Sequence, residues 1–303
     1  MKNQTKAYLF ALASVLFWAT MSSAFKLSLN YISVEGLLFW SIIFAVLSLG
    51  LALLILKKQH KLLHLSKGDI GRSALMGLIT PFLYYLVLFK AYDLLQAQEA
   101  GVLNYTWPLI LVILSVPFLN QKIGLSGFAG IFISFIGLMV ISTKGNLFSL
   151  NFTNPLGVSL AIGSAFLWAT YWIINMRDQR ESISKLFLNM LFALIYITLF
   201  SMIRNTLQWP VKEAWIGVAY IGFFEMGITF IFWLTALKYA ENTAKVSNLI
   251  FLSPFMGLFF IRIFVKEAIM LSTIIGLIMI ISGIMMQQIK PGQFKKIKAF
   301  ISP

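Results

Sequence analysis

Apolar residues form ten long runs along the chain, separated by short polar segments. The runs cover residues 8–27, 34–56, 74–92, 97–119, 124–142, 155–175, 185–203, 214–237, 243–264 and 270–288. A helix of about 20 apolar residues crosses the hydrocarbon core of a bilayer. Strands of an outer-membrane barrel would be about ten residues long and would alternate polar with apolar positions, unlike these runs. The pattern therefore predicts an all-α polytopic membrane protein with ten transmembrane helices.

Short sequences recur in the two halves of the chain. LFWAT at 16–20 returns as FLWAT at 166–170, and a proline and two glycines recur 146 residues apart: Pro108 and Pro254, Gly130 and Gly276, Gly137 and Gly283. We expect two five-helix repeats, at residues 1–145 and 155–290, and a basic tail at 291–303. An odd number of crossings per repeat forces opposite orientations in the membrane. Inverted repeats are typical of secondary transporters, whose substrate site lies near the midplane between the halves.

Composition supports a membrane protein, and the charge pattern gives its orientation. Of 303 residues, 59% are hydrophobic, against about 45–50% in soluble domains. The net charge of +14 could indicate a nucleic-acid partner, but with a cytoplasmic N-terminus 17 of the 24 Lys and Arg residues lie on one side. The other side holds Lys26, Lys90, Lys144, Arg204, Lys212, Arg262 and Lys266. This positive-inside bias explains the charge without nucleic acid, and predicts a plasma (bacterial inner) membrane protein with both termini cytoplasmic.

Residues for enzyme chemistry are scarce. The chain has no cysteine and two histidines, His60 and His64 on a basic loop, which we interpret as solvated residues rather than metal ligands. It has no glycine-rich phosphate loop. We expect neither an enzyme nor a metal or cofactor site.

Glu225 is the clearest polar residue at mid-membrane depth. It lies in GFFEMGITFIFW, where Thr229, Phe232 and Trp233 share its helix face. An ionisable group in hydrocarbon is costly and usually faces protein or a cavity. It indicates a carboxylate in a substrate pathway, which meets a substrate amine or carries a proton. A hydrogen bond that fixes the register of a neighbouring helix is the alternative.

Aromatic residues mark one face of several helices. The sixth helix presents Trp168, Tyr171, Trp172 and Asn175, the first presents Ser14, Trp18, Ser22 and Phe25, and the third presents Tyr85, Phe89 and Tyr92 with Tyr84 adjacent. Such faces often only pack, but faces from both halves together indicate a pocket of rings and a few polar groups. That pocket suits a small amphipathic or planar solute.

Two prolines interrupt apolar runs at matching places. Pro108 and Pro254 lack an N–H, so the carbonyls of Asn104 and Ile250 lose their helical partners. In a membrane these carbonyls need protein, water or a ligand. We expect helix kinks at both prolines, with Asn104 and Trp107 on the side of the freed carbonyl. A kink that serves packing alone remains open.

Glycines of the fifth and tenth helices indicate close helix packing. They are Gly124, Gly127, Gly130 and Gly137, and Gly276 and Gly283. Either helix could also serve a dimer contact, so a monomer and a homodimer both remain open.

These features resemble the EamA-type branch of the drug/metabolite transporter superfamily. The resemblance rests on the two five-helix halves, the FWAT and LWAT openings and the paired prolines. Residues 96–122, QAQEAGVLNYTWPLILVILSVPFLNQK, are most similar to the aromatic amino acid exporter subgroup. There a Tyr-x-Trp-Pro in helix four and a Trp in helix six line the central cavity. By that resemblance Tyr105, Trp107 and Trp168 line a cavity here, and alternating access exports the substrate from the cytoplasm.

We therefore expect a secondary transporter that exports small organic metabolites, with amino acids, aromatic ones among them, as the leading class. Its expected partners are a small-molecule substrate and the lipid bilayer. The expected substrate-binding residues are Tyr84, Tyr85, Asn104, Tyr105, Trp107, Trp168, Trp172, Glu225 and Trp233. An importer or exchanger of another metabolite (nucleotide-like, an amine or a drug) remains open, as does a non-transporting membrane scaffold or sensor.

Overall fold

The computed structural model describes residues 3–63, 65–119, 124–146, 154–241, 246 and 248–287. Across these ranges the regular structure is helical and contains no strand. The expected basic tail at 291–303, along with His64, lies outside the described residues. The predicted all-α fold class is confirmed.

Ten helical crossings occupy the predicted apolar runs. The first five are α1 (Asn3–Ser28), α2 (Val34–Ile55), α3 (Lys67–Gly77) with η2 (Leu78–Leu83) and α4 (Tyr84–Leu94), α5 (Ala97–Asn104) with α6 (Trp107–Leu119), and α7 (Leu125–Ser142). The second five are α8 (Pro155–Met176), α9 (Ser182–Arg204), α10 (Ala214–Tyr220) with η3 (Ile221–Ile228) and α11 (Thr229–Tyr239), η4 (Asn248–Phe251) with α13 (Leu252–Phe260) and η5 (Ile261–Val265), and α14 (Leu271–Gln287). Nine of these crossings, within the described residues, are 18 or more residues long and apolar enough to cross a membrane, and α14 is 17 residues long.

The third crossing starts earlier than hydropathy suggests. The third apolar run begins at residue 74, whereas α3 begins at Lys67. Ser66 and Asp69 form a capping box, in which the Ser66 hydroxyl accepts from the Asp69 N–H and the Asp69 carboxylate accepts from the Ser66 N–H, each at 3.1 Å. This reciprocal bonding satisfies N–H groups at the start of a helix. A polar helix start has no apolar periodicity, so the apolar pattern showed only the later part of this crossing.

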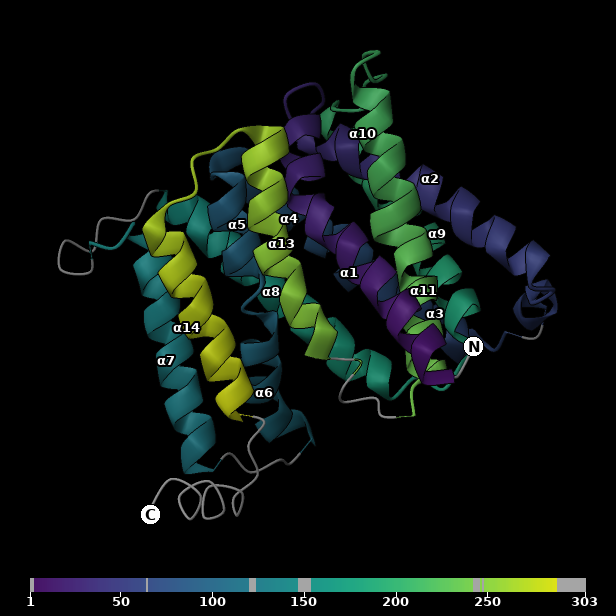
Figure 1. Cartoon of the computed structure of the whole chain (residues 1–303). Coiled ribbons are helices and arrows are strands. Elements are labelled where there is room, and N and C mark those ends of the chain that lie inside the picture. Colours follow the sequence, from purple (N-terminus) through teal and green to yellow (C-terminus); the bar gives the residue numbers. More distant parts are fainter. Residues whose placement is uncertain are drawn as a thin grey trace.

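The two halves pack with a shared pattern of neighbours. In the first half α1 contacts α11 and α13, and its counterpart α8 contacts α4, α5 and α6. The second helices of the halves, α2 and α9, contact each other, as do the last helices, α7 and α14. Figure 1 shows α7 and α14 side by side at one edge of the bundle, with α1 (purple) beside α13. Exchanging the halves reproduces the arrangement, as inverted repeats require.

Glycines bring α7 and α14 into close contact. A Cβ on Gly137 would lie 2.7 Å from the Gly276 carbonyl oxygen, and one on Gly276 would lie 2.6 Å from the Gly137 carbonyl oxygen. A Cβ on Gly283 would clash with the Gly130 carbonyl. These four glycines thus pack the halves of one chain together.

The third crossing of each half is irregular at matching places, because η2 contains a kink at Thr80, whose backbone is extended (φ −145°, ψ 122°), and η3 is a widened helical turn. Such turns shift the register of the side chains that follow and often occur at functional sites. The turn η2 leads directly into Tyr84 and Tyr85, and Glu225 lies within η3.

Candidate functional site

A cavity of about 280 Å³ lies between the two halves. Its lining comes from three crossings of each half: α1, α4 and α5–α6, then α8, η3–α11 and η4–α13. Eight of the nine residues predicted to bind substrate line it: Tyr84, Asn104, Tyr105, Trp107, Trp168, Trp172, Glu225 and Trp233. The ninth, Tyr85, is fully buried beside the cavity and contacts one of these residues, as described below.

Aromatic rings form most of the cavity wall. Trp168 of α8 stacks on Tyr84 of α4 with ring centroids 4.7 Å apart, and Trp172 meets its edge at 5.9 Å. Trp18, the counterpart of Trp168 in the first half, packs against Trp233 at 5.3 Å. Each half therefore contributes the tryptophan of its FWAT or LWAT motif to the same cavity. Stacked rings of this kind can hold a planar solute.

Pro108 lies next to a helix break rather than at a mid-helix kink. The helix α5 ends at Asn104 and α6 begins at Trp107, which makes Pro108 the second residue of α6. A proline in the first turn removes no helical hydrogen bond, so it stabilises a new helix start. The Asn104 side chain joins two other crossings, because its Oδ1 accepts from the Tyr84 hydroxyl at 3.3 Å and its Nδ2 donates to Ser164 Oγ at 2.9 Å.

Pro254 repeats this arrangement in the second half. It is the third residue of α13, which follows the short 3-10 turn η4. The Ile250 carbonyl, which the proline deprives of its helical partner, accepts a hydrogen bond from the Tyr105 hydroxyl at 2.8 Å. The two interrupted helices are therefore bonded to each other across the interface of the halves, and the bond holds the Tyr105 ring at the cavity.

Glu225 is the only ionisable carboxylate among the described lining residues. Its side chain is 8% exposed, and its Oε1 accepts a hydrogen bond from the Tyr85 hydroxyl at 3.0 Å. Its Oε2 has no hydrogen-bond partner among the described residues, and neither has the indole N–H of Trp172. Most buried polar atoms are hydrogen-bonded, so the cavity contains an acceptor and a donor that are available to a ligand.

One end of the cavity is closed by hydrogen bonds between α1 and α4. Ser22 Oγ lies 2.6 Å from the Tyr92 hydroxyl. Lys26 Nζ donates to the carbonyls of Tyr92 and Leu95 at 2.7 and 2.6 Å. The lining residues there, Phe25 and Tyr92, are each 3% exposed. We call this the α1–α4 seal; the sequence analysis assigned Lys26 only to the less basic side of the membrane.

A carboxylate holds a second contact at the same end. Glu267, in the loop before α14, accepts from the N–H groups of Ala97 and Gln98 at 2.8 and 3.2 Å. An acidic side chain at these first N–H groups of α5 stabilises the helix start. At the opposite end of the cavity Met176, the last residue of α8, is 51% exposed. Hydrogen bonds therefore close the cavity where α1 ends, whereas the lining residue where α8 ends is exposed.

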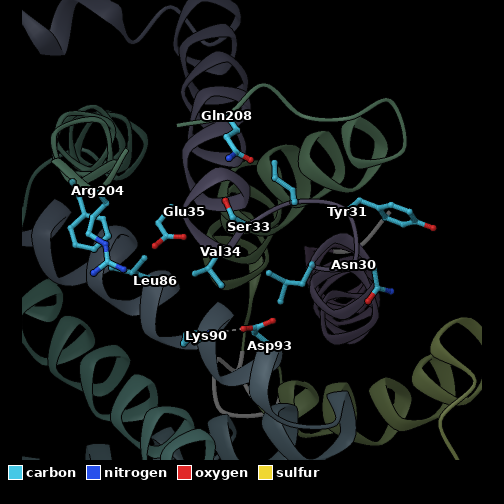
Figure 2. Close-up of a pocket in the computed structure, with 13 residues that line it drawn as sticks. Asn30, Tyr31, Ser33, Val34, Glu35, Leu86, Lys90, Asp93, Arg204 and Gln208 are labelled. Carbon is cyan, nitrogen blue, oxygen red and sulfur yellow. Dashed lines mark hydrogen bonds and ion pairs between the residues drawn. The ribbon is translucent and has the colours of Figure 1, made fainter. Parts of the chain in front are cut away.

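A larger crevice of about 710 Å³ lies on the closed face, between the α1–α2 loop, α4 and the end of α9. Figure 2 shows Glu35, Lys90, Asp93, Arg204 and Gln208 around it. Lys90 and Asp93 already form an ion pair at 2.6 Å, and their side chains are 47% and 41% exposed. None of the predicted site residues lines this crevice. It brings together Lys90 and Arg204, two of the seven cations assigned to the less basic side.

An ion-pair network lies on the opposite, more basic face. Arg180, in the α8–α9 loop, binds Asp178 through two nitrogens, with the shortest distance 2.6 Å, and donates to Ser73 Oγ and the Asp69 carbonyl of α3 at 2.8 Å. Burial raises the pKa of Asp178, but hydrogen bonds from Arg180 and its positive charge together lower it to about 2. Lys58 and Glu181 pair nearby at 2.6 Å. These contacts tie the second half to α3.

The comparisons with known proteins agree with this geometry. The EamA-like transporter family matches the chain twice, over residues 5–143 and 155–287. The chain belongs to the EamA-like transporter family. It is accordingly an integral membrane transporter with two five-helix repeats of opposite orientation, as the sequence predicted.

Relatives within the family cover most of the chain at low identity. The uncharacterized transporter YvbV of Bacillus subtilis is 25% identical over 295 residues, which cover 93% of this chain and 91% of that protein. The aromatic amino acid exporter YddG of Ancylobacter novellus is 25% identical over 158 residues, 52% of this chain and 55% of that exporter. A crystal structure with a TM-score of 0.64 and 20% identity covers 94% of this chain and 96% of its own, which shows a shared fold.

Proposed function

We propose that this transporter exports small organic metabolites that carry an aromatic ring and an amino group, by alternating access through the central cavity. Aromatic amino acids lead the candidate substrates, because relatives include exporters of that name. The observation that carries the proposal is the cavity itself, where stacked rings from both halves surround one carboxylate. Ring stacking would hold the aromatic part and Glu225 the amine.

The proposal assigns each predicted residue a part. Trp168, Tyr84 and Trp107 contact the ring of the substrate, together with Trp172, Trp233 and Tyr105. Glu225 accepts from the amine, with Tyr85 fixing the carboxylate from behind. Asn104 positions Tyr84. Pro108 and Pro254 interrupt the fourth crossing of each half, where the chain can bend as the halves move.

The closed and exposed ends of the cavity are consistent with one state of an alternating-access cycle. We infer from the positive-inside bias that the exposed end, where α8 finishes, faces the cytoplasm of a bacterial inner membrane, with the N-terminus on the same side. The α1–α4 seal then closes the external end. Export would require this seal to open while the cytoplasmic end closes.

Flux across liposomes tests the function. The protein would be reconstituted, loaded with labelled phenylalanine, tyrosine or tryptophan, and flux measured with Trp107→Ala and Trp168→Ala as variants. We expect each variant to lower flux at least about tenfold, because a buried aromatic contact is worth more than about 1.4 kcal/mol. Trp209→Ala is the matched control, since Trp209 is 76% exposed in the loop before α10. Flux by neither aromatic amino acids nor aromatic amines would refute the proposed function.

A further inference from the structure

The central cavity is lined by one carboxyl group and by no basic side chain among its described residues. Among the described residues that line it, Glu225 is ionisable as a carboxylate, and none is Lys, Arg or His. The remaining polar groups of the lining are neutral hydroxyls, indoles and one amide. An isolated carboxylate in a low-dielectric site is strongly unfavourable unless a positive charge or several hydrogen bonds compensate it.

Lys26 of α1 and Lys185 of α9 are each engaged outside this cavity. Lys26 donates to the two carbonyls of the α1–α4 seal. Lys185 lines a separate cavity of about 40 Å³ behind Trp172 and Trp233 and donates to the Asp178 carbonyl at 3.0 Å. Neither Lys26 nor Lys185 belongs to the cavity lining. A ligand in the cavity therefore meets one negative charge and no positive one.

Glu225 is also incompletely hydrogen-bonded. Tyr85 donates to Oε1 at 3.0 Å, while Oε2, buried in a residue 8% exposed, has no partner among the described residues. A substrate ammonium would supply both the missing donor and the compensating charge. The rings of Trp168 and Tyr84 can add cation–π attraction for the same group.

We propose that the preferred substrate of this site is an aromatic amine with a single positive charge and no carboxylate. This inference rests on the proposed function and narrows its substrate class. An aromatic amine makes the occupied site neutral, because its ammonium cancels the Glu225 charge. An aromatic amino acid brings a carboxylate as well, which leaves the occupied site with a net negative charge and no cationic partner for it.

Matched substrate pairs test the inference, since members of a pair differ only in the carboxylate. Calorimetry on the purified full-length protein at neutral pH would compare tryptamine with tryptophan and phenethylamine with phenylalanine. We expect each amine to bind at least about 30-fold more tightly than its amino acid, the lower end of the effect of a buried unpaired charge. Equal or tighter binding of the amino acids would overturn the inference, because the cavity would then contain a partner for the carboxylate.

Substitutions of Glu225 test whether this residue causes the preference for amines over amino acids. Glu225→Gln should weaken tryptamine binding at least about 30-fold and reduce the difference between the tryptamine and tryptophan affinities to within about threefold. Glu225→Asp keeps the charge and should recover part of the tryptamine affinity. Glu35→Gln is the matched control, because it removes a carboxylate of the outer crevice and should leave both affinities unchanged. Unchanged tryptamine binding in Glu225→Gln would contradict the role assigned to this carboxylate.

The outcomes separate this inference from the proposed function. Flux and binding of amino acids without a preference for amines would overturn the inference and keep the proposed function. Binding of neither class by the wild type would overturn both. If Glu225→Gln loses its thermal transition or its monodisperse elution, the comparison of matched pairs on the wild type still decides.

Discussion

The α1–α4 seal makes a quantitative prediction about access to the cavity. In Lys26→Met the side chain keeps its length but loses the ammonium that donates to the Tyr92 and Leu95 carbonyls at 2.7 and 2.6 Å. Hydrogen bonds from charged groups contribute about 1.5–3 kcal/mol each. Because this ammonium is only partly buried and is hydrated again on opening, we take about 2 kcal/mol for the pair. That loss favours opening of the external end about 30-fold.

Single-cysteine labelling measures this opening, and the chain has no cysteine of its own. Leu88→Cys places a thiol in the cavity lining below the seal, at a position 2% exposed. A membrane-impermeant maleimide added to intact cells should label it at least about tenfold faster in Lys26→Met than in the Lys26 background. Inside-out vesicles should show the reverse trend, because external opening requires the cytoplasmic end to close.

Lys90→Met is the matched control for this experiment. Lys90 lies on the same face of the molecule but pairs with Asp93 at the surface. An exposed pair of this kind contributes little, so labelling should not change. Unaltered labelling in Lys26→Met, or an equal increase in Lys90→Met, would refute the idea that Lys26 closes the external end.

Two further predictions concern stability. Asp178→Asn should lower the free energy of unfolding at pH 7 by about 2 kcal/mol, because the Asp178 pKa falls from 3.8 in the unfolded chain to about 2 in the folded protein. A group with a depressed pKa stabilises fully above its unfolded value, so the difference from wild type should vanish between about pH 4 and pH 2 in thermal unfolding; a difference that persists at pH 2 would exclude this ion pair as the cause. Gly137→Ala should cost about 1–3 kcal/mol, since its Cβ would lie 2.7 Å from the Gly276 carbonyl oxygen, whereas Gly163→Ala, with nothing within 4 Å, should not destabilise. Equal melting temperatures for these two alanine variants would contradict the close α7–α14 contact.

The crossings could be predicted from the sequence because a helix that crosses a bilayer must carry a long run of apolar residues. All ten predicted runs contain a helical crossing. The start of α3 was missed because Ser66 and Asp69 are local capping residues with no apolar signal. The breaks next to Pro108 and Pro254 were predicted only as kinks, since a proline in a sequence does not show whether the helix bends or restarts.

Helical periodicity did not predict correctly which face of the third crossing lines the cavity. Helical spacing predicted a cavity face of Tyr85, Phe89 and Tyr92, but Tyr84, Leu88 and Tyr92 line the cavity. The kink at η2, where Thr80 has an extended backbone, lies just before these residues and separates the orientation of α4 from that of α3. Tyr85 lies behind the wall, where it reaches Glu225. An aromatic stripe thus identified the correct helix and misplaced the face by one residue.

Contacts between helices far apart in the sequence could not be predicted from it. Freed carbonyls could be expected at Asn104 and Ile250, but no local pattern indicates that Tyr105, 145 residues from Ile250, donates to one of them. The same holds for Lys26, whose carbonyl acceptors become known only when α1 and α4 are placed side by side. Apolar lining residues such as Leu88 have no chemical mark that separates them from lipid-facing leucines.

The symmetry of the fold does not extend to the charge of its site. Trp18 and Trp168 occupy equivalent places, as do the interrupted helices at Pro108 and Pro254. Alternating access needs such equivalence, because each half must be able to adopt the shape of the other. Gly77 packs against α9 and Gly222 packs against α2, so these two glycines occupy equivalent positions in the third crossings. Counted from them, the residue equivalent to Glu225 in the first half is Thr80. Thr80 does not line the central cavity, so the carboxyl group of Glu225 has no counterpart there. Under the proposed function, the symmetric scaffold would serve movement, and this single asymmetric carboxyl group would select the substrate.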